Sequence, residues 1–455
     1  MPEVLVLGGG IAGLTAAWQL RGRASVTVLE AAGTVGGKLS SASLAGVHVD
    51  TGAESVMALR PEAVELARAV GLGADLCDPA PAPTTLWSHG ALRPLPPGHV
   101  MGIPADPRAL TGTGLLSPEG LARLAREEEL PAPPLAPGAD LSVAGYLTDR
   151  LGAEAVDRLV EPLLGGVYAG RPEHLSLRAA LPRLAALAAQ GGSLLAALRA
   201  GRTGRAPGAA AVQGICGGTV RLPGAVAAAS GARVRTSARA RALRRTPAGR
   251  WQVAADTADG PLLLEADAVV LALPAYAAAG LLRAHSPAAA EDLGAVEHAD
   301  SAVVTLAFDP SRTPDLPRGN GFLVPAVEGR AVKAATFLSA KWPWRTERHP
   351  DLRVVRVSLG RYGERHRLAV PDRELARTAL SELRLATGLT GTPVASLVTR
   401  WERGLPQYGV GHVDRVARIR EAVGKLPGLT VCGAAYDGVG VAACVASGRR
   451  AAQEL

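Results

Sequence analysis

The feature that most constrains this chain lies near its N-terminus, where a short apolar strand runs directly into a glycine-rich turn. Residues 3–7 (EVLVL) have the composition of a buried parallel strand. Gly8, Gly10 and Gly13 follow in the spacing GxGxxG, and an amphipathic helical pattern comes next. The first glycine permits the turn, the second lets the backbone approach a pyrophosphate, and the third allows close packing of helix on strand. The segment therefore predicts a dinucleotide site at a helix N-terminus.

An acidic residue completes this predicted site. A second strand, SVTVLE, ends at Glu30, which lies 20 residues beyond Gly10 and can accept hydrogen bonds from ribose hydroxyls. The motif by itself does not separate FAD from NAD. The residues expected to line the site are Gly8, Gly9, Gly10, Ile11, Ala12, Gly13, Glu30 and Ala31.

The residues after Glu30 narrow the choice of cofactor. The run EAAGTVGGKLSS places a second glycine pair, Gly36 and Gly37, beside the cation Lys38. It resembles the ExxxxxGG[RK] extension of the amine-oxidase superfamily of flavoproteins, in which the cation faces the dinucleotide phosphates. Residues 50–55 (DTGAES) are similar to the segment that passes beside the flavin ring in that superfamily. The resemblance implies FAD as the cofactor, with contacts from Gly37, Lys38, Gly52, Ala53, Glu54 and Ser55.

Segments from the middle and the end of the chain are expected to return to the same domain. Residues 232–237, 251–255 and 262–273 each have the pattern of a strand, and the resemblance implies that the first of them contacts adenine at Val234. The C-terminal strand LTVCGAA precedes a glycine-punctuated turn and a helix. This resembles the closing motif of the superfamily, where a helix N-terminus points at the flavin. The contacts implied there are Gly433, Val439, Gly440 and Val441.

We predict an α/β fold of three parts, because 455 residues exceed what one core usually holds. A Rossmann-like FAD-binding domain, discontinuous in sequence, is expected from residues 1–63, 207–284 and 415–455. An antiparallel-sheet substrate-binding domain is expected from residues 64–100 and 285–414. Residues 101–206 indicate a helical subdomain. Its segment LPRLAALAAQGGSLLAALRAGR is either an interfacial amphipathic helix or, as we favour, two packed helices.

Two further segments identify a narrower family. Residues 161–170 (EPLLGGVYAG) and 401–412 (WERGLPQYGVGH) resemble the protoporphyrinogen/coproporphyrinogen III oxidase family, most closely the coproporphyrinogen III oxidases of Gram-positive high-GC bacteria. The resemblance implies that Trp401 lies against the flavin and that Gly165 and Gly166 let the backbone approach a flat macrocycle. His412 is expected to be structural. The cations expected to bind propionates are Arg60 and, as a weaker second choice, Lys341.

The same resemblance implies an enzyme of haem biosynthesis. We expect an FAD-dependent, six-electron oxidation of coproporphyrinogen III to coproporphyrin III that uses molecular oxygen and releases H2O2. The sequence shows no obvious acid–base dyad, so no catalytic residue is assigned. Protoporphyrinogen IX oxidase is the first alternative. A flavin amine or carotenoid oxidase and a non-catalytic binding protein similar to the GDP-dissociation inhibitors are the others.

The composition of the chain limits which binding partners are expected. The formal net charge is +8, yet no run of basic residues interleaved with aromatics is present, so we expect no nucleic acid. The four cysteines lack CxxC spacing, and we expect reduced thiols and no metal. No signal peptide and no apolar stretch of membrane-spanning length are evident, which predicts a cytoplasmic protein. Peripheral contact with the membrane and with haem-pathway enzymes stays open.

Overall fold

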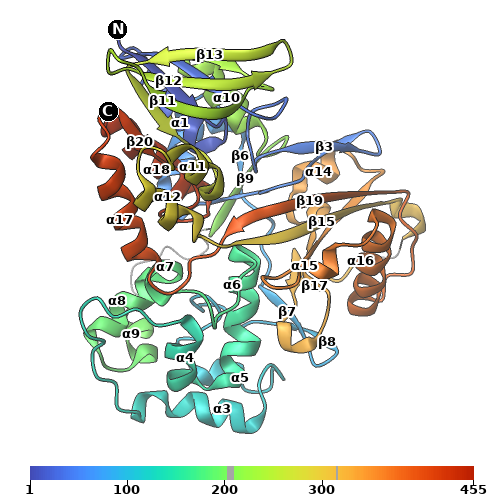
Figure 1. Cartoon of the computed structure of the whole chain (residues 1–455). Coiled ribbons are helices and arrows are strands. Elements are labelled where there is room, and N and C mark those ends of the chain that lie inside the picture. The colour runs from blue at the N-terminus through green and yellow to red at the C-terminus, as the bar shows by residue number, and fades with distance from the viewer. Residues whose placement is uncertain (202–209, 314–315) are drawn as a thin grey trace.

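The computed structural model describes residues 1–201, 210–313 and 316–455. Its N-terminal strand lies inside a five-stranded, fully parallel sheet in the order β10-β2-β1-β14-β20, drawn at the top of Figure 1. Short apolar runs form these strands because both faces of the sheet are covered. Their bounds are β1 (Glu3–Leu7), β2 (Ser25–Leu29), β10 (Arg233–Arg235), β14 (Ala268–Leu271) and β20 (Leu429–Val431).

Each face of this sheet has its own core. One core joins the sheet to α1 (Ile11–Gln19), α2 (Pro61–Ala69), α10 (Arg221–Ser230) and α18 (Val441–Gln453). The other joins it to a three-stranded antiparallel sheet and to further helices. These elements are β11 (Arg239–Arg245), β12 (Trp251–Thr257), β13 (Gly260–Ala266), α11 (Ala275–Leu282), α12 (Pro287–Gly294) and α17 (His412–Gly424).

One predicted strand is wrong as a single element. Residues 262–273 divide into β13, which pairs with β12, and β14, which pairs with β1. In β13 half-buried and exposed residues alternate, as in a sheet with one solvated face, whereas all four residues of β14 are buried. The chain changes sheet at Asp267, whose carboxylate accepts a hydrogen bond from the backbone N–H of Glu3 at 2.8 Å.

A second, seven-stranded sheet has the order β19-β15-β18-β17-β16-β7-β8 and is antiparallel except between β16 and β7. The helix α16 (Asp372–Thr387) packs its apolar stripe on one face. Figure 1 shows that the long β15–β19 pair reaches from this sheet towards the parallel-sheet unit. The strand bounds are β7 (Thr85–Ser88), β8 (Ala91–Pro94), β15 (His298–Phe308), β16 (Gly321–Leu323), β17 (Val332–Phe337), β18 (Arg353–Leu359) and β19 (Ala395–Pro406).

The third unit is helical and lies at the bottom of Figure 1. The segment with two alternative interpretations forms two helices, α8 (Pro182–Gln190) and α9 (Leu194–Ala200), with buried leucines in the core of this unit. None of the helices in the described ranges is long and apolar enough to span a membrane. The remaining helices of the unit are α3 (Pro118–Ala125), α4 (Val143–Leu151), α5 (Ala153–Ala155), α6 (Glu161–Tyr168) and α7 (Leu177–Ala180).

Short elements connect the three units. A turn of π-helix, η4 (Val156–Val160), precedes α6, and such turns occur frequently near functional sites. Two small sheets are the hairpin β3–β4 and the sheet β5-β9-β6. The remaining bounds are β3 (Ser41–Leu44), β4 (Val47–Asp50), β5 (Val56–Met57), β6 (Leu76–Cys77), β9 (Val212–Ile215), α13 (Leu338–Lys341), α14 (Pro343–Arg348) and α15 (Arg365–Leu368). Five 3-10 turns complete the described elements: η1 (Gly73–Asp75), η2 (Pro107–Leu110), η3 (Arg126–Glu129), η5 (Pro310–Arg312) and η6 (Ala326–Glu328).

The mixed α/β architecture agrees with the predicted fold class, whereas the domain limits stay a prediction. Two of the proposed limits cut through packed elements, because most of α2 and all of α12 were assigned to the substrate-binding domain. Both helices pack in the cores around the parallel sheet. The proposed limit at residue 207 lies outside the described residues.

Candidate flavin and substrate site

The glycine-rich turn between β1 and α1 is fixed by close backbone approaches. Gly8 has φ +110°, and a Cβ there would lie 2.4 Å from the carbonyl oxygen of Ala272. A Cβ at Gly13 would lie 2.1 Å from the carbonyl oxygen of Gly8. A Cβ at Gly10 would meet no protein atom within 4 Å. Gly8 and Gly13 therefore serve the fold, and Gly10 borders open space of the kind a pyrophosphate needs.

Two helices begin beside this turn without side-chain caps. The N-cap residues are Gly10 for α1 and Gly440 for α18, and neither makes a side-chain capping hydrogen bond. The two helices cross closely, because a Cβ at Gly448 would lie 2.2 Å from the carbonyl oxygen of Ala12. The first-turn N–H groups, including those at Ile11 and Val441, leave a positive end that suits an anionic group.

Glu30 lies where the sequence predicts it, at the end of β2. Its two carboxylate oxygens accept hydrogen bonds from the backbone N–H groups of Gly9 and Ala32, each at 2.7 Å. These bonds orient the carboxylate and leave lone pairs for ribose hydroxyls. The backbone of Glu30 also bonds to Arg235 on β10, the strand that carries Val234. Ala31 is exposed beside it.

The second glycine pair closes over the first turn. The N–H of Gly36 donates to the carbonyl of Gly9 at 2.8 Å, and a Cβ at Gly37 would lie 3.4 Å from Cα of Gly10. Lys38 is solvent-accessible, yet surrounding protein lowers its pKa through burial, an effect that the nearby Cys444 opposes. Solvent access together with a pKa lowered by burial is expected for a side chain that lines an internal cavity. A cation, two free helix ends and the open side of Gly10 fit the phosphates of FAD.

Residues 50–55 pack against the backbone of Lys38. The N–H of Ala53 donates to the Lys38 carbonyl at 3.0 Å, and a Cβ at Gly52 would lie 1.8 Å from that same oxygen. The indole N–H of Trp401 donates to the carbonyl of Thr51 at 3.0 Å. The sheet strand β19 is thus tied to the segment expected beside the flavin. That Trp401 lies against the flavin itself stays a prediction.

The predicted residues Glu54 and Lys341 form an ion pair with each other. The ammonium of Lys341 lies 2.5 Å from Oε1 of Glu54, and both side chains are largely buried. Burial raises the pKa of Glu54, but the charges of Lys341, Arg356 and Arg345 together hold that pKa below its usual value. Glu54 neutralises the positive charge of Lys341. We therefore propose that Lys341 positions Glu54 and is less suited to bind a substrate carboxylate directly.

Arg60 and the C-terminal turn come together at the other side of the site. A guanidinium nitrogen of Arg60 lies 3.9 Å from the Cβ position of Gly438, and Arg60 pairs with Glu62 at 3.1 Å. The N–H of Gly433 donates to the hydroxyl of Ser447 at 3.1 Å, which anchors the start of this turn. The remaining predicted contacts are half-buried or lie at the surface of the turn, namely Ser55, Val439, Gly440 and Val441.

The helix α6 carries the predicted glycine pair. Gly165 is buried and Gly166 is exposed, with open space on its side except for Leu323, which lies 3.6 Å from its Cβ position. His412 is buried and stacks on Tyr408, with ring centroids 4.0 Å apart. Burial, together with the charge of Arg415, lowers the pKa of His412 to about 4. A neutral, stacked histidine fits the expected structural role.

The comparisons with known proteins place the chain in a family. It belongs to the flavin containing amine oxidoreductase family, whose model matches residues 11–455. It is 37% identical over 459 residues to the coproporphyrinogen III oxidase of Mycobacterium tuberculosis (strain ATCC 25618 / H37Rv), covering 98% of this chain and 95% of that protein. The chloroplastic protoporphyrinogen oxidase of Oryza sativa subsp. japonica is 29% identical over 491 residues, covering 100% and 88%. A solved structure from Exiguobacterium sp. 255-15, provisionally named a protoporphyrinogen oxidase, shares 32% identity with a TM-score of 0.87, covering 99% and 98%.

The family membership confirms the predicted cofactor and enzyme class: the protein is an FAD-dependent oxidoreductase.

The sequence interpretation missed several charged residues next to the site. Arg345 lies 3.6 Å from Asp50, and both side chains are almost fully buried. Arg356 and Lys333 lie on β18 and β17 of the seven-stranded sheet, where the charge of Arg356 reaches both Glu54 and Lys333. No motif contains them, and only the strand register brings them to the site.

Proposed function

We propose that this enzyme oxidises coproporphyrinogen III to coproporphyrin III in haem biosynthesis, with molecular oxygen as electron acceptor. The observation that carries the proposal is the full-length likeness to relatives named coproporphyrinogen III oxidase. The conversion removes six electrons and six hydrogens from the macrocycle in three two-electron rounds. Three molecules of oxygen would take them up as three molecules of H2O2.

The residues of the chain would position the reactants. FAD, when bound, supplies the two-electron redox chemistry. Glu30, Lys38 and the N-terminus of α1 would hold its ribose and phosphates, and Trp401 keeps the sheet against the flavin segment. The exposed Gly166 on α6 has no side chain to obstruct the approach of a flat macrocycle. The substrate gains conjugation on oxidation, so the reaction requires no strong general base.

Protoporphyrinogen IX is the second candidate substrate, favoured by the likeness to the rice enzyme and to the Exiguobacterium structure. It carries two propionates where coproporphyrinogen III carries four. The net charge of +8 favours the substrate with more carboxylates. We also propose a cytoplasmic enzyme, whose net charge of +8 suits peripheral contact with anionic membranes. Contact with neighbouring pathway enzymes is part of the same proposal.

The proposal is tested by supplying each porphyrinogen to the FAD-loaded enzyme in air. We expect a higher kcat/KM for coproporphyrinogen III than for protoporphyrinogen IX and three molecules of H2O2 per porphyrin formed. Porphyrin fluorescence and a peroxide assay report the two products. A preference for protoporphyrinogen IX would make that compound the substrate in place of coproporphyrinogen III. Oxidation of amines or carotenoids with neither porphyrinogen consumed would contradict the proposal, as would a protein that binds FAD and oxidises nothing.

A further inference from the structure

One face of the seven-stranded sheet turns towards the flavin segment. In the register of β15, Ser301 pairs with Trp401 and Thr305 pairs with Arg356. Alternate residues of a strand share a face, so Arg356 lies on the same face as Trp401, which reaches the carbonyl of Thr51. The intervening residues of β18 lie in the opposite core under α16. Arg356 therefore projects into the space between the sheet and the flavin segment.

The guanidinium of Arg356 has no hydrogen-bonding or ion-pair partner among the residues that the structure describes. The residue is half-buried. The acids whose charges reach it are Glu54 and Asp50, and these already pair with Lys341 and Arg345. A partly desolvated cation with five unused donors is unfavourable unless an anion binds to it. A carboxylate matches the fork of an arginine.

A β-bulge brings a second cation to the same face. The pairing of β17 with β18 shifts between Val332 and Ala334, so Lys333 is an extra residue without a partner on β18. Ala334 pairs with Ser358, which shares the face of Arg356, and the charge of Arg356 acts on Lys333. Lys333 is only 7% exposed and its ammonium makes no hydrogen bond or ion pair with a described residue. Bulges commonly re-aim side chains beside active sites.

The acidic residues around Lys333 do not neutralise its positive charge. The neighbouring acids Glu161 and Glu364 lie 3.5 and 3.9 Å from the guanidinium of Arg361, which takes up their charge. Burial first, and then the charges of Arg361 and Arg356, lower the pKa of Lys333 to about 7. Near neutral pH this lysine can therefore gain or lose its proton as an anion binds or leaves.

The two ends of α6 separate these cations from Arg60. Glu161, within electrostatic reach of Lys333, is the first residue of α6, and Tyr168, within reach of Arg60, is the last. The ends of such a helix lie about 10 Å apart. The open surface at Gly166 lies between them. Cations thus face both ends of the surface that we propose for the macrocycle.

We infer that Arg356 and Lys333 form a carboxylate subsite that binds one edge of the porphyrinogen while Arg60 faces the opposite edge. The inference rests on the proposed function. A macrocycle with carboxylates on both edges gives each set of cations a partner. A macrocycle with propionates on one edge only would leave one set facing apolar vinyl groups, which a desolvated site disfavours. The arrangement therefore selects for the substrate with four carboxylates.

The test measures the affinity of the FAD-loaded enzyme for coproporphyrin III and for its tetramethyl ester in the same nonionic detergent. Arg356→Gln and Lys333→Met should each weaken binding of the free acid by roughly tenfold to a hundredfold. Both should leave binding of the uncharged ester unchanged relative to the wild type, and Arg356→Lys should restore part of the loss. Arg244→Gln, an exposed position on β11, is the control for the lost charge.

A pH series adds a readout that a structural role would not produce. The wild type should lose affinity for the free acid as the pH rises above about 7, because the carboxylate favours the protonated form of Lys333. Lys333→Met should lack this loss; the charged groups facing position 333 are Glu161, Glu364, Arg361 and Arg356. Equal losses for acid and ester, or unchanged affinities, would overturn the subsite. A wild type that does not oxidise coproporphyrinogen III would instead overturn the proposed function.

Discussion

Gly10→Ala is expected to give a folded protein that no longer retains FAD. A Cβ at this position meets no protein atom within 4 Å, and the backbone angles of Gly10, φ −72° and ψ 171°, suit alanine. The added methyl group would instead occupy the space proposed for the pyrophosphate. Loss of one or two charge-assisted hydrogen bonds from backbone to phosphate would weaken FAD binding by roughly tenfold to several hundredfold. Titration of the apoprotein with FAD measures this affinity.

Gly13→Ala is the matched control for that variant. Its Cβ would lie 2.1 Å from the carbonyl oxygen of Gly8, so this change is expected to disturb the strand–helix packing itself. Thermal unfolding of the two apoproteins should therefore separate them, with Gly10→Ala close to the wild type and Gly13→Ala markedly less stable. If Gly10→Ala bound FAD as tightly as the wild type, the glycine-rich turn would not be the phosphate site.

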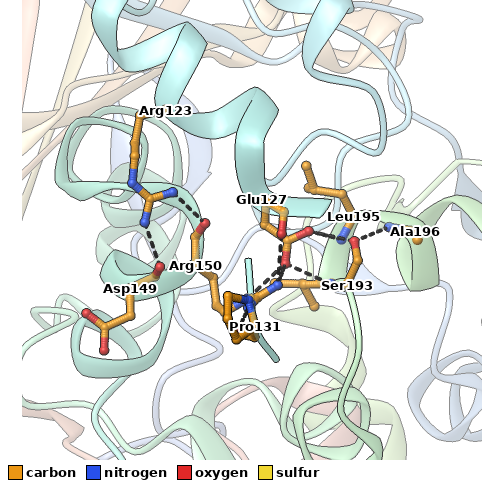
Figure 2. Close-up of polar contacts among 9 residues, drawn as sticks. Arg123, Glu127, Pro131, Asp149, Arg150, Ser193, Leu195 and Ala196 are labelled. Carbon is orange, nitrogen blue, oxygen red and sulfur yellow. Dashed lines mark hydrogen bonds and ion pairs between the residues drawn. The ribbon is translucent and has the colours of Figure 1, made fainter. Parts of the chain in front are cut away.

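Glu127→Ala is expected to destabilise the helical unit by about 3–5 kcal/mol, the range found when a buried charge loses its partner. Figure 2 shows that the carboxylate of Glu127 joins Arg150 to the N-terminus of α9. The guanidinium of Arg150 donates to it, as do Ser193 Oγ at 2.6 Å and the backbone N–H of Leu195 at 3.3 Å. Glu127 is fully buried, so alanine leaves Arg150 without a counter-charge. Urea unfolding and amide exchange of residues 118–200 measure the loss.

Glu128→Ala is the control for this prediction. The neighbouring Glu128 pairs with Arg199 at 2.5 Å, but both side chains are more than 40% exposed, so its loss should cost less than about 1 kcal/mol. Equal effects of the two substitutions would contradict the account of Figure 2.

Glu127 should also make the unit sensitive to acid. Burial raises its pKa, but the hydrogen bonds from Ser193, Arg150, Leu194 and Leu195 outweigh this and hold the pKa below the usual 4.5. A carboxylate with a depressed pKa contributes stability above its unfolded-state pKa and loses it as the pH falls towards the folded-state value. The difference in stability between the wild type and Glu127→Ala should therefore shrink below about pH 4.5.

The parts of the site that the sequence predicts well are contiguous. The turn from Gly8 to Gly13, the acid at Glu30 and the cation at Lys38 occupy one stretch of chain, and each has a local reason for its residue type. Strand, turn and helix must follow in that order for the dinucleotide fold to form. The structure therefore has little freedom to place these residues elsewhere, and it brings all of them to one end of the parallel sheet.

The parts that the sequence does not predict depend on contacts between distant segments. Glu54 and Lys341 are 287 residues apart, and nothing local to either one indicates the pair. The position of Lys333 depends on a one-residue bulge, which moves a side chain to the other face of a sheet without a clear sequence signature. The sequence also does not predict the change of sheet at Asp267, because apolar residues continue on both sides of it.

The most direct test of the central claim is an anaerobic titration of the FAD-loaded enzyme with coproporphyrinogen III, followed by admission of air. The account predicts that the flavin is bleached as porphyrin fluorescence appears, with three flavins reduced for each porphyrin formed, and that air restores the oxidised flavin. A fully loaded flavin that stays oxidised in excess coproporphyrinogen III would contradict the account.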